Sequence, residues 1–271
     1  MESRVRLAPR ALIIAQLLAF CPVWVWFAWR LTSCPNQWWE ALPLVSVAVV
    51  LYFRRANAAV ALTNRDLLLP LALTALYAVV YPRVPELLRA ALAFTALTGL
   101  LSVVCFRCRF SLGLWVLMLL GLQLHNGLQF YLGYPLRVLC AAVVAPLLCL
   151  TGFRVTRQGT CLDWSGELIL IDAPCSGVKM LWTGMFLTAL LACYYNFNAV
   201  RTIVIGACTL VIVLAANILR AASLFYVEAG IFNVPAWSHD AVGMIVFAAA
   251  VICIAAIAEI IARRKSCALP S

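Results

Sequence analysis

Long apolar segments separated by short basic or turn-rich segments dominate this sequence. Eight of them are candidate membrane-spanning helices, at roughly 11–29, 38–53, 67–81, 87–106, 112–131, 178–197, 201–227 and 241–262. A helix needs about 20 apolar residues to cross a hydrocarbon core of about 30 Å, so the second and third segments are short for a crossing. The first segment lacks a small-residue cleavage site, which favours an uncleaved span over a signal peptide. The pattern predicts an all-α polytopic membrane protein with about eight transmembrane helices.

Composition agrees with a lipid environment. Hydrophobic residues make up 66% of the chain and charged residues 11%, whereas a soluble domain carries about a quarter charged residues. The net charge of +10 does not indicate a nucleic-acid partner, because the basic residues punctuate the apolar segments as the positive-inside rule requires. Nucleic-acid binding is therefore not expected.

The basic residues also predict an orientation. With the N-terminus in the cytoplasm, twelve of the 20 Lys and Arg residues fall on the cytoplasmic side. Eight crossings then return the C-terminus and its basic tail, 263–271, to the cytoplasm. Segment 135–151 is apolar too, but a full crossing there would invert everything downstream. Its prolines, Pro135 and Pro146, favour a re-entrant or interfacial helix instead.

The one substantial polar stretch is 152–174. Turn residues at 158–159 and 164–166 separate short runs at 153–156 and 167–171, which predicts a small β-hairpin on the outer face of the membrane. We expect a single integral membrane domain, with N-terminal helices over 1–110 and a second part over 111–262.

The chain has 12 cysteines, most of them inside apolar segments, where cysteine acts as a small hydrophobe. Cys105 and Cys108 form a single CxxC without a second pair, which disfavours a zinc or redox site. Cys34 and Cys161 lie in loops, and the sequence leaves open whether they pair as a disulfide. We see no metal-ligand cluster and no phosphate-binding loop, so no metal or cofactor is expected.

Cys175 differs from the other cysteines because it precedes a membrane helix directly after the hairpin. The unpaired N–H groups and the dipole of a helix N-terminus favour a thiolate, and Lys179 adds a cation one turn later. The same N–H groups can form an oxyanion hole. Gly177 lets a substrate backbone come close, and Ser176 lies beside the thiol. Cys175 is therefore a candidate nucleophile, against the alternative of a free cysteine in a loop.

Two further positions fall at the same predicted membrane level. Arg220 lies about 28 Å along its helix, with Asn217 on the same face, and can stabilise an oxyanion or clamp a carbonyl. The alternative is an interfacial arginine or an ion pair with Glu228. His239, in an outer loop, can serve as a general acid and base, and Asp240 is a candidate for orienting it.

His125 is the competing histidine. It lies in LQLHNGLQF with Gln123, Asn126 and Gln129, in the outer half of the predicted fifth span. Such a polar cluster can line a substrate groove or form hydrogen bonds between helices, and the sequence leaves both open.

Four stretches carry a resemblance to a known family: QFYLGYPLR at 129–137, GFRVTRQG…LILIDAPCSGVKML across 152–181, NILR at 217–220, and WSHD around His239. The order and approximate spacing of Cys, Arg and His in them resemble the exosortase/archaeosortase family of membrane cysteine transpeptidases and proteases. The resemblance covers roughly residues 112–262, whereas the four N-terminal spans match only in hydrophobic character.

The resemblance implies Cys175 as nucleophile, Arg220 as stabiliser of the oxyanion or substrate, and His239 as acid and base. The expected supporting or substrate-binding residues are Ser176, Gly177, Lys179, Asn217, Asp240, His125, Asn126 and Gln129. Family substrates are exported proteins with a C-terminal sorting signal: a short motif (Pro-Glu-Pro in the best-known type), a transmembrane helix and a basic tail. Cleavage would occur at the outer face of a bacterial inner membrane, followed by release or by transfer to an envelope glycan or lipid.

Three alternatives belong to other classes. A transporter would suit the number of spans, but transporters place their polar residues near the membrane midplane and often contain repeated halves. An intramembrane serine protease would use Ser176 or Ser165. A non-catalytic assembly component of an envelope polysaccharide system would not need Cys175 at all.

Overall fold

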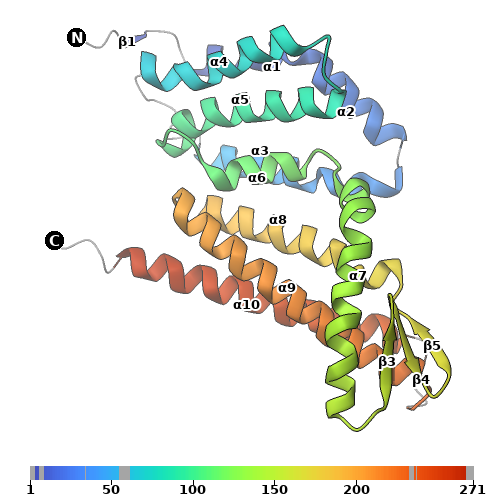
Figure 1. Ribbon diagram of the computed structural model, residues 1–271. Helices are drawn as coiled ribbons and strands as arrows, with labels where there is room; N and C mark the ends of the chain where they lie inside the picture. The colour runs from blue at the N-terminus through green and yellow to red at the C-terminus, as the bar shows by residue number, and fades with distance from the viewer. Residues whose placement is uncertain are drawn as a thin grey trace. The chain divides into compact units, whose positions relative to one another are not determined.

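The computed structural model describes residues 4–5, 9–33, 35–54, 62–231, 235 and 237–266. The chain is mostly helical (Figure 1). Its internal contacts divide it into two compact units, one of Met1–Leu124 with Ala189–Thr202 and the other of His125–Thr188 with Ile203–Ser271. The domain boundaries given above remain a prediction.

The first unit contains most of the N-terminal helices. Its elements are β1 (Arg4–Val5), α1 (Pro9–Ala19), α2 (Cys21–Ser33), η1 (Pro35–Ala41), α3 (Leu42–Arg54), β2 (Leu62–Thr63), α4 (Asn64–Val80), α5 (Glu86–Phe106) and α6 (Leu112–Leu120). β1 and β2 form a short antiparallel pair. Helix α5 forms the core of this unit, because every residue from Ala96 to Phe106 is buried. Arg54 lies over the Phe106 ring and donates a hydrogen bond to the Cys193 carbonyl at 2.6 Å.

The second unit contains the polar stretch and the long C-terminal helices. Its elements are α7 (His125–Leu150), β3 (Val155–Gln158), β4 (Cys161–Trp164), β5 (Glu167–Leu170) and η3 (Ala173–Ser176), followed by α8 (Val178–Tyr194), α9 (Ala199–Glu228) and α10 (Ser238–Ser266), of which α8 and α9 also enter the first unit. Gly184 lets α8 approach α9, since a Cβ there would lie 2.9 Å from Val213 Cγ2. Thr188 and Thr209 share a buried hydrogen bond of 2.6 Å across the same contact. Figure 1 shows α7 running steeply across α8, α9 and α10.

The structure supports a multi-pass membrane protein with fewer candidate spans than the eight expected. Among the described residues, four helices (α5, α7, α9 and α10) are long and apolar enough to cross a membrane. The pair α1 and α2, bent by 61°, makes a fifth if it is one span, and α8 is a shorter apolar helix.

Two predicted segments are wrong in their limits. The expected span at 112–131 is not one helix, because α6 ends at Leu120 and a turn follows, with Gln123 in the left-handed conformation at φ 56°. Segment 135–151 is not a separate re-entrant piece, because residues 125–150 form one helix of 26 residues. Pro135 and Pro146 lie inside this helix, as membrane helices tolerate when other groups satisfy the carbonyls that proline leaves without a donor.

The predicted hairpin is a three-stranded antiparallel sheet in the order β3-β4-β5. The second turn falls where the sequence placed it, and the first lies one residue later than expected, at Gly159–Thr160. The second is the two-residue turn Ser165–Gly166, with φ of 56° and 89°, a geometry whose twist suits a hairpin. Strand β4 was missed because it consists of only four residues between two turns. Cys161 lies in β4, whereas its candidate disulfide partner Cys34 is outside the described residues.

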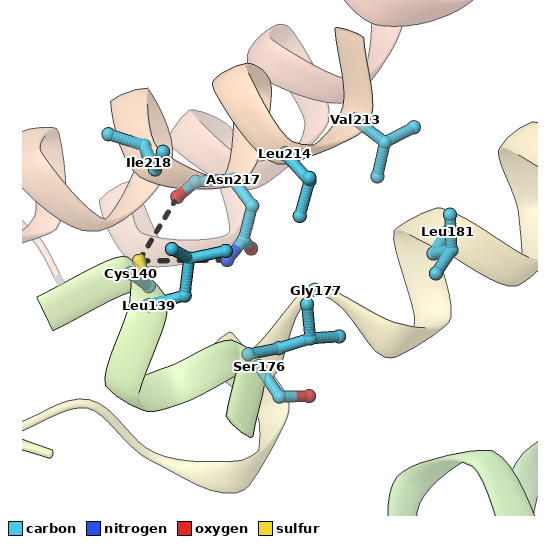
Figure 2. Close-up of a pocket in the computed structure, with 10 residues that line it drawn as sticks. Leu139, Cys140, Ser176, Gly177, Leu181, Val213, Leu214, Asn217 and Ile218 are labelled. Carbon is cyan, nitrogen blue, oxygen red and sulfur yellow. Dashed lines mark hydrogen bonds between the residues drawn. The ribbon is translucent and has the colours of Figure 1, made fainter. Parts of the chain in front are cut away.

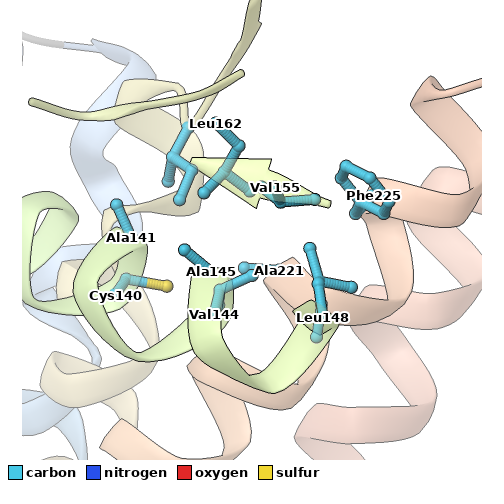
Figure 3. Close-up of a cluster of buried hydrophobic side chains, with 11 residues drawn as sticks. Cys140, Ala141, Val144, Ala145, Leu148, Val155, Leu162, Ala221 and Phe225 are labelled. Atoms are coloured by element: carbon cyan, nitrogen blue, oxygen red, sulfur yellow. The ribbon is translucent and has the colours of Figure 1, made fainter. Parts of the chain in front are cut away.

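An apolar cluster joins this sheet to α7 and α9 (Figure 3). One face of α7 supplies Cys140, Ala141, Val144, Ala145 and Leu148, spaced as a helical stripe. The sheet, the segment after it and α9 supply the rest: Val155, Leu162, Ile171, Ala221, Ala222 and Phe225. The half-buried Cys175 packs against the edge of this cluster, so the sheet and two helices together fix the position of the η3 segment.

Candidate active site

Cys175 lies in η3, a single 3₁₀ turn between the sheet and α8. Its backbone N–H donates to the Asp172 carbonyl at 2.9 Å. Gly177 ends the turn in the left-handed conformation at φ 81°, and α8 begins only at Val178. Cys175 therefore directly precedes the apolar helix α8, but its own N–H is already hydrogen-bonded, so any oxyanion hole must use other donors.

Asn217 of α9 holds this segment in place (Figure 2). Its Nδ2 donates to the Cys175 carbonyl at 3.0 Å and lies 3.7 Å from Cys140 Sγ. A Cβ at Gly177 would lie only 2.8 Å from Asn217 Cγ, so the amide fits because position 177 is glycine. Asn217 is buried, and these contacts fix the backbone on both sides of Ser176.

Ser176 connects the same segment to α7. Its Oγ donates to Gln129 Oε1 at 3.1 Å and accepts from the Val178 N–H at 3.4 Å. The side chain is 2% exposed. A buried hydroxyl with both hydrogen bonds made holds the loop and is poorly placed to attack a substrate, which disfavours the serine-protease alternative at this position.

The electrostatic surroundings of Cys175 differ from the sequence expectation. Burial raises the pKa of the Cys175 thiol, the Arg220 guanidinium opposes that rise, and the carboxylates of Glu228 and Asp172 add to it. The balance is a raised pKa, so the thiol is protonated at neutral pH and needs a base. Arg220 is the cation that favours the thiolate, whereas Lys179 lines the groove described below.

We expect Arg220→Gln to raise the pKa of Cys175 further, because the positive charge that stabilises the thiolate is lost. At a fixed neutral pH, alkylation of Cys175 by iodoacetamide should be slower, and its pH profile should move to higher pH. Peptide-resolved mass spectrometry separates Cys175 from the other cysteines. Lys179→Gln is the matched control, and a larger shift in that variant would contradict the assignment to Arg220.

A groove of about 920 Å³ lies beside the nucleophile segment, within the range of ligand-binding pockets. Its wall residues are His125 and Gln129 of α7, Ser176, Lys179, Met180 and Thr183 from η3 and α8, Arg220 of α9, and Asp240, Gly243, Met244 and Phe247 of α10. Gly243 leaves room for Arg220, since a Cβ there would lie 3.2 Å from Arg220 Nε. The groove therefore brings together six of the residues predicted from sequence, including Arg220 and both Lys179 and Asp240.

His239 and Asn126 are not among the wall residues of this groove. His239 is in the first turn of α10, and its Nδ1 lies 3.8 Å from Glu228 Oε1 at the end of α9. Asp240, expected to orient His239, lines the groove. Asn126 is exposed on α7 and is not among the groove's wall residues.

Sequence reasoning missed two neighbours of the site. Glu228 was weighed only as a partner of Arg220, although it lies eleven residues after Asn217, about three turns along the same helix face. Cys140 comes from α7, and nothing in its local sequence connects it with Asn217.

The chain matches a known protein family over most of its length. A family model described as transmembrane exosortase (EpsH) matches residues 10–256. The chain belongs to the transmembrane exosortase family. The resemblance seen in sequence is thereby confirmed, and the exosortase match also includes the N-terminal helices, which resembled the family only in hydrophobic character. No curated protein and no solved structure matches the chain.

Proposed function

We propose that this exosortase family member is a cysteine transpeptidase or peptidase that cleaves C-terminal sorting signals through an acyl-thioester on Cys175. The observation that carries the proposal is the setting of the Cys175 thiol. The positive charge of Arg220 favours the Cys175 thiolate, and Arg220 also lines the large groove. Ser176, the residue after Cys175, lines the same groove. The chain with this arrangement belongs to the exosortase family.

The proposed chemistry divides between three side chains. His239 takes the proton from Cys175 Sγ, and the thiolate attacks the scissile carbonyl. Arg220 donates to the oxyanion of the tetrahedral intermediate. His239⁺ then protonates the leaving amine as the C–N bond breaks, leaving the exported protein as a thioester. Water, or an amine or hydroxyl of an envelope acceptor, resolves the thioester in the second step.

The polarity of the groove supports a membrane-anchored substrate. Lys179 and Asp240 lie in the first turns of α8 and α10, whereas Thr183 and Phe247 lie deeper along the same helices. Phe247 is seven residues beyond Asp240, about 10 Å along the helix axis. The groove thus runs from a charged end to an apolar end, which suits a short motif followed by a hydrophobic helix. In our proposed orientation the charged end faces the outside of the inner membrane.

The test uses a secreted reporter that ends in a Pro-Glu-Pro motif, an apolar helix and a basic tail. We expect co-expression with the chain to release the reporter from its tail. In membranes supplied with hydroxylamine, the new C-terminus should be a hydroxamate, because hydroxylamine attacks the thioester and frees the thiol. A reporter that keeps its tail would contradict this substrate class. Cleavage without any hydroxamate would contradict the acyl-thioester.

A further inference from the structure

We propose that Glu228 is the positioning residue of His239: its carboxylate accepts a hydrogen bond from the Nδ1–H, leaving Nε2 to exchange the proton with Cys175. The first half of this inference starts from the observed contact between the two side chains, and the second half rests on the proposed function.

The contact between Glu228 and His239 joins the ends of two helices. Glu228 is the last residue of α9 and His239 the second residue of α10. Glu228 Oε1 lies 3.8 Å from His239 Nδ1, longer than a hydrogen bond but within the range of an ion pair. Contacts of catalytic groups are often long in unliganded enzymes and shorten when substrate binds. Both side chains are partly exposed, which leaves them room to move closer.

The charged groups around His239 single out Glu228. Asp240 is adjacent in sequence but lines the groove on α10. Asp172 precedes η3 and acts on Cys175 and on Glu228. Arg220, two turns before Glu228 on α9, is a cation and cannot accept a hydrogen bond from the imidazole. Among the described ion pairs, the one that involves His239 is with Glu228.

The position of Glu228 suits a role beside a cation better than a role beside a thiolate. Its carboxylate disfavours the Cys175 thiolate, so by itself it would slow a thiol nucleophile. When Cys175 gives its proton to His239, however, a positive imidazolium forms next to Glu228. The carboxylate then stabilises the charge that the transfer creates, as the aspartate of a Ser-His-Asp triad does.

A hydrogen bond from His239 Nδ1 to Glu228 requires one particular tautomer of the neutral imidazole. A carboxylate accepts only from a protonated nitrogen, so neutral His239 carries its proton on Nδ1 and its lone pair on Nε2. The chain contains 2 histidines. Histidine labelled with ¹⁵N therefore gives signals from only two rings, and His125→Gln leaves those of His239 alone.

The first test is solid-state ¹⁵N spectroscopy of the labelled His125→Gln chain in lipid. We expect a protonated Nδ1 and an unprotonated Nε2 for neutral His239. Adding Glu228→Gln should shift the ring toward the Nε2-protonated tautomer, whereas adding Asp240→Asn should leave it as it was. A ring that is Nε2-protonated from the start, or that responds to Asp240→Asn and not to Glu228→Gln, overturns the proposal. This readout does not depend on activity.

The second test is reporter cleavage. We expect Glu228→Gln to lower kcat roughly 10- to 100-fold with little change in KM, and Glu228→Asp to restore part of it. This is less than the roughly 10⁴-fold loss in a buried triad, because the side chains of His239 and Glu228 are 37% and 40% exposed. Asp240→Asn, in the groove, should act mainly on KM. If the wild-type chain fails to cleave, the proposed function fails; if it cleaves and Glu228→Gln cleaves equally well, only this inference fails.

Discussion

Cys175→Ser is expected to abolish cleavage of the anchored reporter, by at least about 10³-fold, while the protein still accumulates in the membrane. A serine hydroxyl is far less acidic than a thiol, so His239 cannot deprotonate it as readily as it would the Cys175 thiol. The substitution replaces one atom by a smaller one at the edge of the apolar cluster, so the fold should persist. Immunoblotting of the reporter and of the chain in the same membranes measures both quantities.

Cys253→Ser is the matched control for this variant. Cys253 is exposed on α10, outside the groove and the nucleophile segment. We expect cleavage at the wild-type rate. If Cys175→Ser also cleaved at that rate, the nucleophile would lie elsewhere or the chain would act as a non-catalytic component.

Gly177→Ala should reduce cleavage about 100-fold even though Cys175 itself is unchanged. Position 177 has φ 81°, which costs an L-residue about 1–2 kcal/mol. The new Cβ would also lie 2.8 Å from Asn217 Cγ. Relief of this overlap must move the Asn217 amide away from the Cys175 carbonyl or move the segment itself. A displacement of about 1 Å at a reacting group is enough for a loss of that size.

Gly152→Ala separates the effect of the positive φ from the effect of the contact with Asn217. Gly152 also has a positive φ, 96°, but a Cβ there meets nothing within 4 Å. We expect similar small losses of thermal stability for the two variants in detergent, and near-normal cleavage for Gly152→Ala only. Equal loss of cleavage in both would contradict the argument that the contact with Asn217 matters.

Hydropathy identified most of the helices but predicted more spans than the described residues support, and it misplaced the limits of two segments. Residues 112–131 read as one span because the turn at 121–124 contains almost no polar residue and is as apolar as the helices around it. Gln123 enters the left-handed region there, a change of backbone direction that leaves hydropathy unaltered. The predicted segments also divided α7, because its prolines suggested a helix end at a point where the helix continues.

The parts of the candidate site that lie close together in the sequence could be predicted from it. The Cys175 segment stood out because a turn, a glycine and a long apolar segment follow one another within a few residues. Asp240 was considered for orienting His239, but successive residues on a helix point about 100° apart. Asp240 therefore faces the groove while His239 faces Glu228. Adjacency in sequence therefore does not tell which carboxylate lies near the imidazole.

The half-burial of Cys175 bears on how this chain could be inhibited. With the raised pKa, little thiolate is present at neutral pH, so simple electrophiles have no advantage at this cysteine over the exposed ones. Selectivity must come from binding before reaction. A covalent inhibitor would therefore combine a weak electrophile with an apolar tail that lies against Met244 and Phe247, so that occupancy of the groove, and not intrinsic reactivity, determines which thiol is modified.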